Sequence, residues 1–157
     1  MRDITPEDLH GEHGQRHELD FFDGTRRVVY VVEREVPFPE GSLIVSRTDP
    51  RGIITHANQA FVDMSGYGEA ELIGQPHAIL RHPHMPAAAF RGLWDTLARG
   101  EKWHGYVKNL RKDGAYYWVY ATVVANRRGG AVVGFTSVRR KPSRARIAAA
   151  EALYRTL

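Results

Sequence analysis

The spacing of apolar side chains changes along the chain and divides its first half into short elements. Residues 1–24 are polar, rich in histidine and poor in large aliphatic side chains, which predicts a mobile or loosely packed leading segment. The β-branched run RRVVYVVEREV at 26–36 predicts a strand that ends before a proline. Segments 43–49 and 53–58 predict two more strands, which the turn sequence DPRG joins into a hairpin.

The middle of the chain is predicted to be helical. Asn58 can cap a helix over the sequence QAFVDMSG, and EAELIG and HAIL predict two short helical segments after it. Pro86 then begins a longer helix that ends at Gly100. The apolar residues of this helix recur with the spacing i, i+3, i+4 and i+7, and they are Phe90, Leu93, Trp94 and Leu97. This spacing predicts one apolar face that packs against the rest of the fold.

Three strands and a final helix are predicted for the last third of the chain. WHGYVKNLRKDG and AYYWVYATVVANRRGG are joined by a Lys-Asp-Gly turn, and AVVGFTSVRR returns after two glycines. SRARIAAAEALYRTL is rich in alanine and predicts a helix that Ser143 can cap. The apolar stripe of this helix consists of Ile147, Ala150, Leu153, Tyr154 and Leu157.

The order of these elements predicts an α+β fold. Five strands form an antiparallel sheet, and the short helices between the second and third of them cover one face of it. A small pocket can lie between that face and the helices. We expect residues 1–40 to form an N-terminal extension or cap, residues 41–141 the main domain, and residues 142–157 a C-terminal helix.

The composition is that of one globular domain with a modest core. The chain has 157 residues, of which 43% are hydrophobic and 25% are charged. It contains no cysteine, which excludes disulfides, zinc–thiolate sites, iron–sulfur clusters and cysteine catalysis. Because neither a membrane-spanning apolar run nor a signal peptide is found, we expect a cytoplasmic protein.

The charge distribution narrows the classes of function. The formal net charge is +4, and much of it lies in Arg139, Arg140, Lys141, Arg144 and Arg146. We expect this basic segment to be a solvated flank, because no nucleic-acid-binding motif accompanies it. No nucleophile lies in a recognised frame with a base, and no carboxylate lies in a metal-binding frame with the histidines. The sequence therefore favours neither an enzyme, a metal site nor a nucleic-acid-binding protein.

The turn sequence RHPHMP and the elements after it hold the strongest candidates for ligand binding. Arg81 offers a bidentate fork for a phosphate, or alternatively forms a surface ion pair with Glu69 or Glu71. Trp94 either packs in the core through the apolar stripe of its helix or stacks on a planar ligand. Asn109 either points its amide at a ligand or lies at an edge of the sheet.

A family resemblance runs through the same residues. THANQAFVDMSGYGEAELIGQPHAILRHPHMPAAAF, followed by LWDTLARGEKWHGYVKNLRKDGAYYWV, resembles the PAS domain of bacterial aerotaxis receptors, which bind FAD and report redox state. The motifs SGY, ELIGQPH, KDG and YWV occur in PAS domains of many kinds. LRHPHMP together with W…G…VKN is more specific and marks the flavin-binding aerotaxis-type subgroup. The likeness covers residues 43–139 and continues weakly through the terminal AAAEALYRTL.

The resemblance implies a non-covalently bound FAD. It associates Arg81, His82 and Trp94 with the cofactor, and it implies that Asn109 hydrogen-bonds the isoalloxazine ring. The family pattern at the turn is RHPDMP, and in this chain His84 replaces the acidic residue. This substitution changes a side chain expected at the edge of the cofactor.

Four further residues are candidates for the walls of the pocket. His56 and Asn58 lie at the end of the second strand of the hairpin, although Asn58 also has a role as a helix cap, and Thr136 and Ser137 lie on the last strand. A PAS domain with haem on one axial histidine is an alternative, and a ligand-free PAS interaction module is a third. Because the chain has no cysteine, light-driven flavin–cysteine chemistry is excluded.

The resemblance and the residues together predict a redox- or oxygen-responsive sensor rather than an enzyme. Reduction of a bound flavin changes the hydrogen bonding at its N5 atom, so that a facing amide or hydroxyl moves and biases a two-state element. We expect the signal to leave through the C-terminal helix or the N-terminal segment, toward a signalling protein or output domain. Both segments carry apolar residues suited to homodimer formation.

Overall fold

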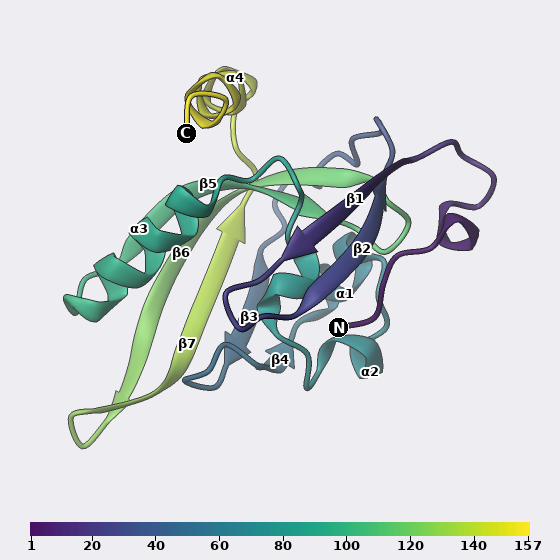
Figure 1. The fold of residues 1–157 in the computed structure, drawn as a ribbon. Helices are drawn as coiled ribbons and strands as arrows, with labels where there is room; N and C mark the ends of the chain where they lie inside the picture. Colours follow the sequence, from purple (N-terminus) through teal and green to yellow (C-terminus); the bar gives the residue numbers. More distant parts are fainter.

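The computed structural model describes all 157 residues and is built around a five-stranded antiparallel sheet (Figure 1). The strand order is β4-β3-β7-β6-β5, so the first two strands of the sheet lie beside the last one. The strands are β3 (Ile44–Thr48), β4 (Ile54–Ala57), β5 (Trp103–Leu110), β6 (Tyr116–Arg128) and β7 (Ala131–Arg140). The predicted α+β class and the five-stranded antiparallel sheet are confirmed.

Side chains of the sheet alternate between two faces, as the pleat of a strand requires. We call the face toward α1 (Gln59–Ser65), α2 (Glu69–Leu72) and α3 (Ala87–Ala98) the inner face, and the opposite face, which carries α4 (Arg144–Tyr154), the outer face. The short helix η2 (His77–Leu80) lies with α1 and α2. The main apolar core lies between the inner face and these helices. Its buried members are Phe38, Ile44, Ile54, Phe61, Met64, Tyr67, Leu72, Ile79, Leu80, Tyr117, Val119 and Ala121.

Helix α3 is less firmly packed than its apolar stripe predicts. Only Leu97 is buried, while Phe90 and Leu93 are half-buried. Trp94 keeps 45% of its surface exposed and meets the sheet edge-on, with its ring 5.3 Å from that of Phe135. The expectation that this stripe packs fully against the fold is therefore wrong for Trp94.

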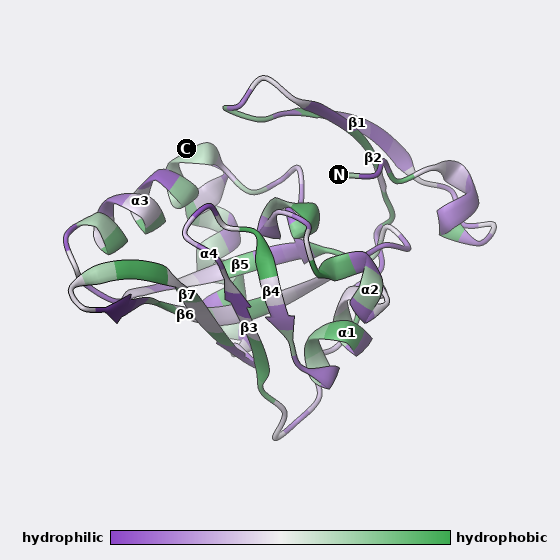
Figure 2. Cartoon of the chain, turned by 90° about the horizontal axis from the view of Figure 1, so that it is seen from below, coloured by the Kyte–Doolittle hydropathy of each residue, from purple (hydrophilic) through white to green (hydrophobic).

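The N-terminal segment is ordered, contrary to the prediction for residues 1–24. It forms the short helix η1 (Pro6–Leu9) and a hairpin of β1 (Gln15–Asp20) with β2 (Arg26–Val31). Ile4 and Leu9 are buried in a second apolar cluster with residues of β2 and of the β5–β6 turn. β1 is strongly hydrophilic (Figure 2), which explains why its composition resembles that of a loop.

Arg27 fixes this hairpin to the helical layer. Its side chain is 1% exposed and donates to the carbonyl oxygen of Ile79 at 2.7 Å and to the hydroxyl of Tyr67 at 3.0 Å. Its Nε atom also donates to the carbonyl oxygen of Arg2 at 2.8 Å. A buried guanidinium with these acceptors holds the hairpin strongly, because moving the hairpin away would leave the buried charge with fewer hydrogen bonds.

The predicted strand at 26–36 changes its partner along its length. It pairs with β1 up to Val31. The backbone amides of Val32 and Val36 then donate hydrogen bonds to the carbonyl oxygens of Gly114 and Tyr116 at the β5–β6 turn. The N-terminal segment is therefore continuous with the main domain at this end of the sheet.

The C-terminal helix α4 covers part of the outer face. Ser143 caps it by accepting a bond from the amide of Arg146. Ile147 and Ala150 are buried and pack against Trp118, whereas Leu153 and Leu157 of the predicted stripe remain exposed. No helix in the structure combines the length and apolar character needed to cross a membrane.

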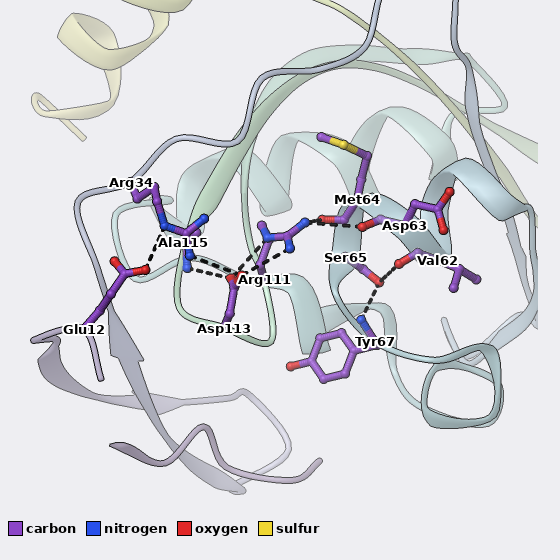
Figure 3. Close-up of polar contacts among 10 residues, drawn as sticks. All are labelled: Glu12, Arg34, Val62, Asp63, Met64, Ser65, Tyr67, Arg111, Asp113 and Ala115. Carbon is purple, nitrogen blue, oxygen red and sulfur yellow. Dashed lines mark hydrogen bonds and ion pairs between the residues drawn. The ribbon is translucent and has the colours of Figure 1, made fainter. Parts of the chain in front are cut away.

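An ionic network holds the β5–β6 turn to the end of α1 and to the N-terminal segment (Figure 3). The guanidinium of Arg111 donates to the carbonyl oxygens of Met64 and Asp63 at the end of α1. Asp113 accepts from Arg111 at 3.1 Å and from Arg34 at 3.3 Å, and Arg34 also pairs with Glu12. This turn is thus a junction of three parts of the chain.

We predict that Asp113→Asn weakens this junction in a pH-dependent way. Burial opposes ionisation of Asp113, but its bonds with Arg111 and Arg34 outweigh burial and lower its pKa. A carboxylate with a lowered pKa stabilises the fold above its unfolded pKa of about 3.9, and this contribution is lost as the pH falls through the folded pKa. Because solvent screens part of the interaction, we expect a loss of about 1–2 kcal/mol in unfolding free energy at pH 7.

Urea denaturation at pH 7 and pH 3 measures this effect. The difference between Asp113→Asn and the wild type should shrink at pH 3, because this pH lies below the unfolded pKa of about 3.9 and the unfolded wild type then gains stability by taking up a proton. Asp95→Asn, a change on the exposed surface of α3, is the matched control and should leave stability unchanged. Equal differences at both pH values would contradict the ionic role of Asp113.

Candidate functional site

The turn after η2 lies along the edge strand β5 and sends its side chains to both faces of the sheet. Arg81 forms an isolated antiparallel bridge with Asn109. Paired residues of an antiparallel bridge point to the same side, so Arg81 shares the inner face with Asn109. His82, the next residue, points to the opposite side and packs against Tyr116 of the outer face.

Arg81 presents a guanidinium without an ion-pair partner at the margin of the inner face. It lies 6.0 Å from the ring of Phe21 and 5.1 Å from that of Phe90, and its Nε atom is buried without a hydrogen-bond partner. Burial lowers its pKa. The alternative ion pair with Glu71 is not formed, because that carboxylate binds Lys112 at 2.8 Å.

Asn109 and Tyr117 form a cross-strand pair in the interior of the inner face. Asn109 is 5% exposed, and its amide nitrogen has no hydrogen-bond partner. The hydroxyl of Tyr117 also lacks a partner, and burial raises its pKa. Val107 precedes Asn109 on the same face by strand alternation. An unpaired buried amide costs about 1–3 kcal/mol, so this position is suited to a ligand that accepts a hydrogen bond.

A buried basic cluster lies farther along the inner face. Arg139 is 2% exposed and donates to the hydroxyl of Ser46 at 2.6 Å, while its guanidinium lies 4.5 Å from the ring of Phe61. His77 stacks on Phe61, and its Nε2 atom lies 3.2 Å from the Ser46 hydroxyl and 3.4 Å from Arg139. No carboxylate belongs to this cluster.

The cluster is shielded from solvent, so water does not stabilise charges on its side chains. Burial lowers the pKa of Arg139 to about 10. Burial, and then the positive charge of Arg139, lower the pKa of His77 to about 3. His77 is therefore a neutral acceptor near pH 7. The expectation that Arg139 belongs to a solvated basic flank is wrong, because strand alternation turns it inward, two residues after Ser137.

Three of the candidate wall residues do not lie in the site. Thr136 points to the outer face, where its hydroxyl bonds the amide of Asn126 at 2.8 Å. His56 is exposed beside Arg47 and bonds Thr55. Asn58 has a structural role, because its side chain caps α1 and also bonds the backbone of β3.

The bonds of Asn58 use both ends of its amide. Its oxygen accepts from the amides of Phe61 and Val45 at 3.0 and 3.1 Å, and its nitrogen donates to the carbonyl oxygen of Leu43 at 2.9 Å. Both the oxygen and the nitrogen are therefore engaged by the backbone, which accounts for the residue without a ligand. Ser137, by contrast, is half-buried on the inner face between Ser46 and Val123.

His82 has a structural role rather than a place on the inner face. It is 1% exposed, and its Nδ1 atom accepts a bond from the amide of His84 at 3.0 Å. Burial, and then the charge of Lys108, lower its pKa to about 2. The direct cofactor contact that the resemblance implies for His82 is therefore not supported by its orientation.

The inner face thus combines apolar surface with polar groups that point inward. Arg81, Asn109 and Ser137 of the expected set lie on this face, and Trp94 stands at the rim of α3 over Phe135. Sequence reasoning missed His77, Ser46 and Arg139 as a unit. The two-residue period of β7 could have assigned Arg139 to the inner face, but the contact between Ser46 and His77 depends on the tertiary fold.

A family model described as the PAS fold matches residues 54–139, more than half of the chain. The chain belongs to the PAS-fold family. The predicted resemblance to PAS domains of aerotaxis receptors is also confirmed. The chain is 47% identical over 128 residues to the aerotaxis receptor of Escherichia coli (strain K12), a match that covers 82% of this chain and 25% of the receptor.

Other relatives match the PAS segment more narrowly. The nitrogen fixation regulatory protein of Klebsiella pneumoniae is 35% identical over 80 residues, which cover 51% of this chain and 16% of that protein. The chain therefore spans a quarter or less of the length of these curated relatives.

Solved structures with the same fold include flavin-related PAS proteins. A light-oxygen-voltage domain studied with a flavin analogue superposes with a TM-score of 0.59 and 30% identity, over 73% of this chain and 84% of that one. The dark structure of the blue-light photoreceptor Aureochrome1 LOV gives a TM-score of 0.63 over 72% of this chain and 85% of that one. Its identity of 21% supports the fold alone.

We predict that His77 and His82 stay neutral throughout the physiological pH range of this PAS domain. Their lowered pKa values, about 3 and about 2, place protonation well below pH 5. Unfolded histidine titrates near pH 6.5, so this pair contributes stability that is present above about pH 6.5 and is lost as the pH falls further. Imidazole ¹⁵N NMR between pH 5 and 8, assigned with His77→Gln and His82→Gln, should show no titration of either ring. A midpoint near 6.5 would contradict their burial.

Proposed function

We propose that this PAS domain binds FAD non-covalently and passes the redox state of the flavin to a signalling partner or output domain. The observation that supports it most directly is the unpaired, buried amide of Asn109 on the inner face. The aerotaxis receptor and the flavin-related structural neighbours support the same cofactor. With this cofactor bound, the domain would sense redox state or oxygen.

The residues on the inner face fit the parts of such a cofactor. A flavin ring is planar and apolar on both sides, with hydrogen-bonding groups along its pyrimidine edge. Val123, Phe135 and Leu93 are half-buried side chains on the facing surfaces of the sheet and α3, and they would line the ring. The Asn109 amide would bond the polar edge. Arg81, at the margin, would hold the pyrophosphate through its bidentate fork.

The last strand offers a route from the site to the end of the chain. When bound, FAD supplies a group whose hydrogen-bonding pattern differs between the oxidised and reduced states. Ser137 and Arg139 face the site from β7, and α4 begins a few residues later. A rotation of the Ser137 hydroxyl or a shift of the Arg139 guanidinium would change the strand that leads into α4. We infer that α4, or the hairpin held by Arg27, carries the signal and forms any homodimer.

We infer sensing rather than catalysis for the same site. Ser46 and His77 lie within hydrogen-bond distance, the arrangement of a nucleophile and its base. In a catalytic triad a carboxylate would orient the base, but here Arg139 lies beside His77, and the pKa of His77 is about 3. An imidazole with so low a pKa is a poor general base near pH 7. The trio therefore suits positioning of a ligand better than proton transfer.

An absorption spectrum of the freshly purified chain tests the proposal. We expect the flavin bands, and we expect Asn109→Ala and Arg81→Ala each to lower FAD affinity about tenfold or more. Arg91→Ala, on the exposed side of α3, and His56→Ala, on the outer face, are matched controls that should keep the flavin. Trp94→Ala should have a smaller effect than Asn109→Ala, because nearly half of this ring is exposed.

The same spectrum separates the alternatives. A Soret band would replace the proposal with a haem sensor. Colourless protein that takes up no FAD on reconstitution would leave the PAS interaction module as the function. Loss of flavin in the two control variants, to the same extent as in Asn109→Ala, would show that the amide is not the contact proposed.

A further inference from the structure

A separate pocket lies on the outer face, between the turn after η2 and the C-terminal helix. It has a volume of about 300 Å³. The turn supplies His84 and Met85, the sheet supplies Lys108 and Trp118, and α4 supplies Glu151, Tyr154 and Arg155. The sheet separates this pocket from the inner face, so it is distinct from the flavin site proposed above.

Lys108 is an almost completely buried cation in this pocket. Its residue surface is 7% exposed, and its ammonium lies 3.1 Å from Nδ1 of His84 and 4.2 Å from the centre of the Tyr116 ring. None of the ion pairs of the chain includes Lys108. Burial lowers its pKa, and the more distant carboxylates of Glu33 and Glu151 act in the opposite direction. The ammonium retains donor hydrogens that no carboxylate contacts.

The side chains in direct contact with the Lys108 ammonium carry no negative charge. His84 accepts from Lys108 through Nδ1, which leaves its proton on Nε2 as a further donor. The ring of His17 meets that of His84 at 6.3 Å, and its Nε2 atom is buried without a partner. The one carboxylate among the lining residues, Glu151, lies 3.4 Å from the guanidinium of Arg155. The lining side chains therefore carry one net positive charge when the histidine is neutral.

Position 84 explains why the ammonium lacks a counterion. The side chain beside the ammonium is the imidazole of His84. A carboxylate at that place would lie beside Lys108 and pair with it. The imidazole keeps a hydrogen bond but contributes no negative charge, so a buried cation remains uncompensated.

We propose that this pocket binds a small organic carboxylate, which supplies the counterion that Lys108 lacks. Lys108 and the Nε2–H group of His84 bind the carboxylate, and Met85, Trp118 and Tyr154 contact the apolar part of the ligand. A monoanion matches the net charge of the lining. The volume and the apolar walls favour an organic anion over a bare inorganic one.

Occupancy would stabilise the docking of α4. The helix supplies three of the lining residues, and its Tyr154 already donates to the carbonyl oxygen of Tyr106 at 2.5 Å. A carboxylate between Lys108 and α4 adds contacts that exist only while the helix lies on the outer face. The bound anion would thus act on the segment that follows β7 without contacting the inner face.

Calorimetric titration of the whole 157-residue chain with benzoate tests the proposal. We expect saturable binding with one site and a melting temperature that rises with benzoate concentration. Lys108→Met should weaken binding about tenfold or more, since it removes the charge-assisted contact. Lys102→Met, an exposed lysine just before β5, is the matched control and should bind as the wild type does.

Substitutions at position 84 give a second test that does not depend on the folding of Lys108→Met. His84→Asp should supply an internal counterion, weaken benzoate binding about tenfold or more, and raise the melting temperature without benzoate. His84→Asn has nearly the same shape as His84→Asp but no charge, and its amide keeps an N–H donor, so it should bind benzoate more weakly than the wild type and more tightly than His84→Asp does. No saturable binding to the wild type, or equal binding by His84→Asp and His84→Asn, would overturn the proposal. Binding of inorganic phosphate but not of benzoate would also overturn it.

Discussion

The two-residue alternation of side chains across a sheet covered on both faces is the constraint on which the rest of the structure depends. Asn109 points into the domain because Lys108 points out, and Ser137 and Arg139 face the helices because Thr136 faces away from them. A slip of one residue in the register of β5 or β7 would exchange these sets completely. The burial of apolar side chains on the inner face opposes such a slip, because every inward side chain would move to the opposite face.

Three cations make the two faces chemically unusual. Arg139 is buried on the inner face, Arg81 lies at its margin, and Lys108 is buried on the outer face, and none of them contacts a carboxylate. Hydroxyl, imidazole and aromatic partners recover only part of the hydration energy that burial removes. A fold maintains such groups when their lost hydration is offset elsewhere. The ligands proposed above, one on each face, would provide that offset, whereas replacement of the cations by apolar residues would stabilise the chain without a ligand.

The sequence predicts the sheet, its order of elements and most of the helix positions, because β-branched strands, the DPRG and KDG turns and the proline before α3 act locally. It does not predict β1, whose polar composition is that of a loop until β2 pairs with it and Arg27 anchors the hairpin. Arg81 and Asn109 were identifiable from their motifs. The motifs do not show that His56, Thr136 and Asn58 lie outside the site. Their exclusion depends on strand register and on the use of the Asn58 amide as a helix cap.

The turn after η2 connects the two faces mechanically. Arg81 pairs with Asn109 and points inward, while His82 and His84 point outward to Tyr116 and Lys108. A displacement of the Asn109 backbone would therefore move the residues that line the outer pocket, and the anion proposed beside Lys108 would resist that displacement. Coupling between two sites requires only that each ligand favours one position of a shared element. Here the shared element is a short turn pinned to an edge strand, so the redox state on one face and the anion on the other would each change the free energy of the other's binding.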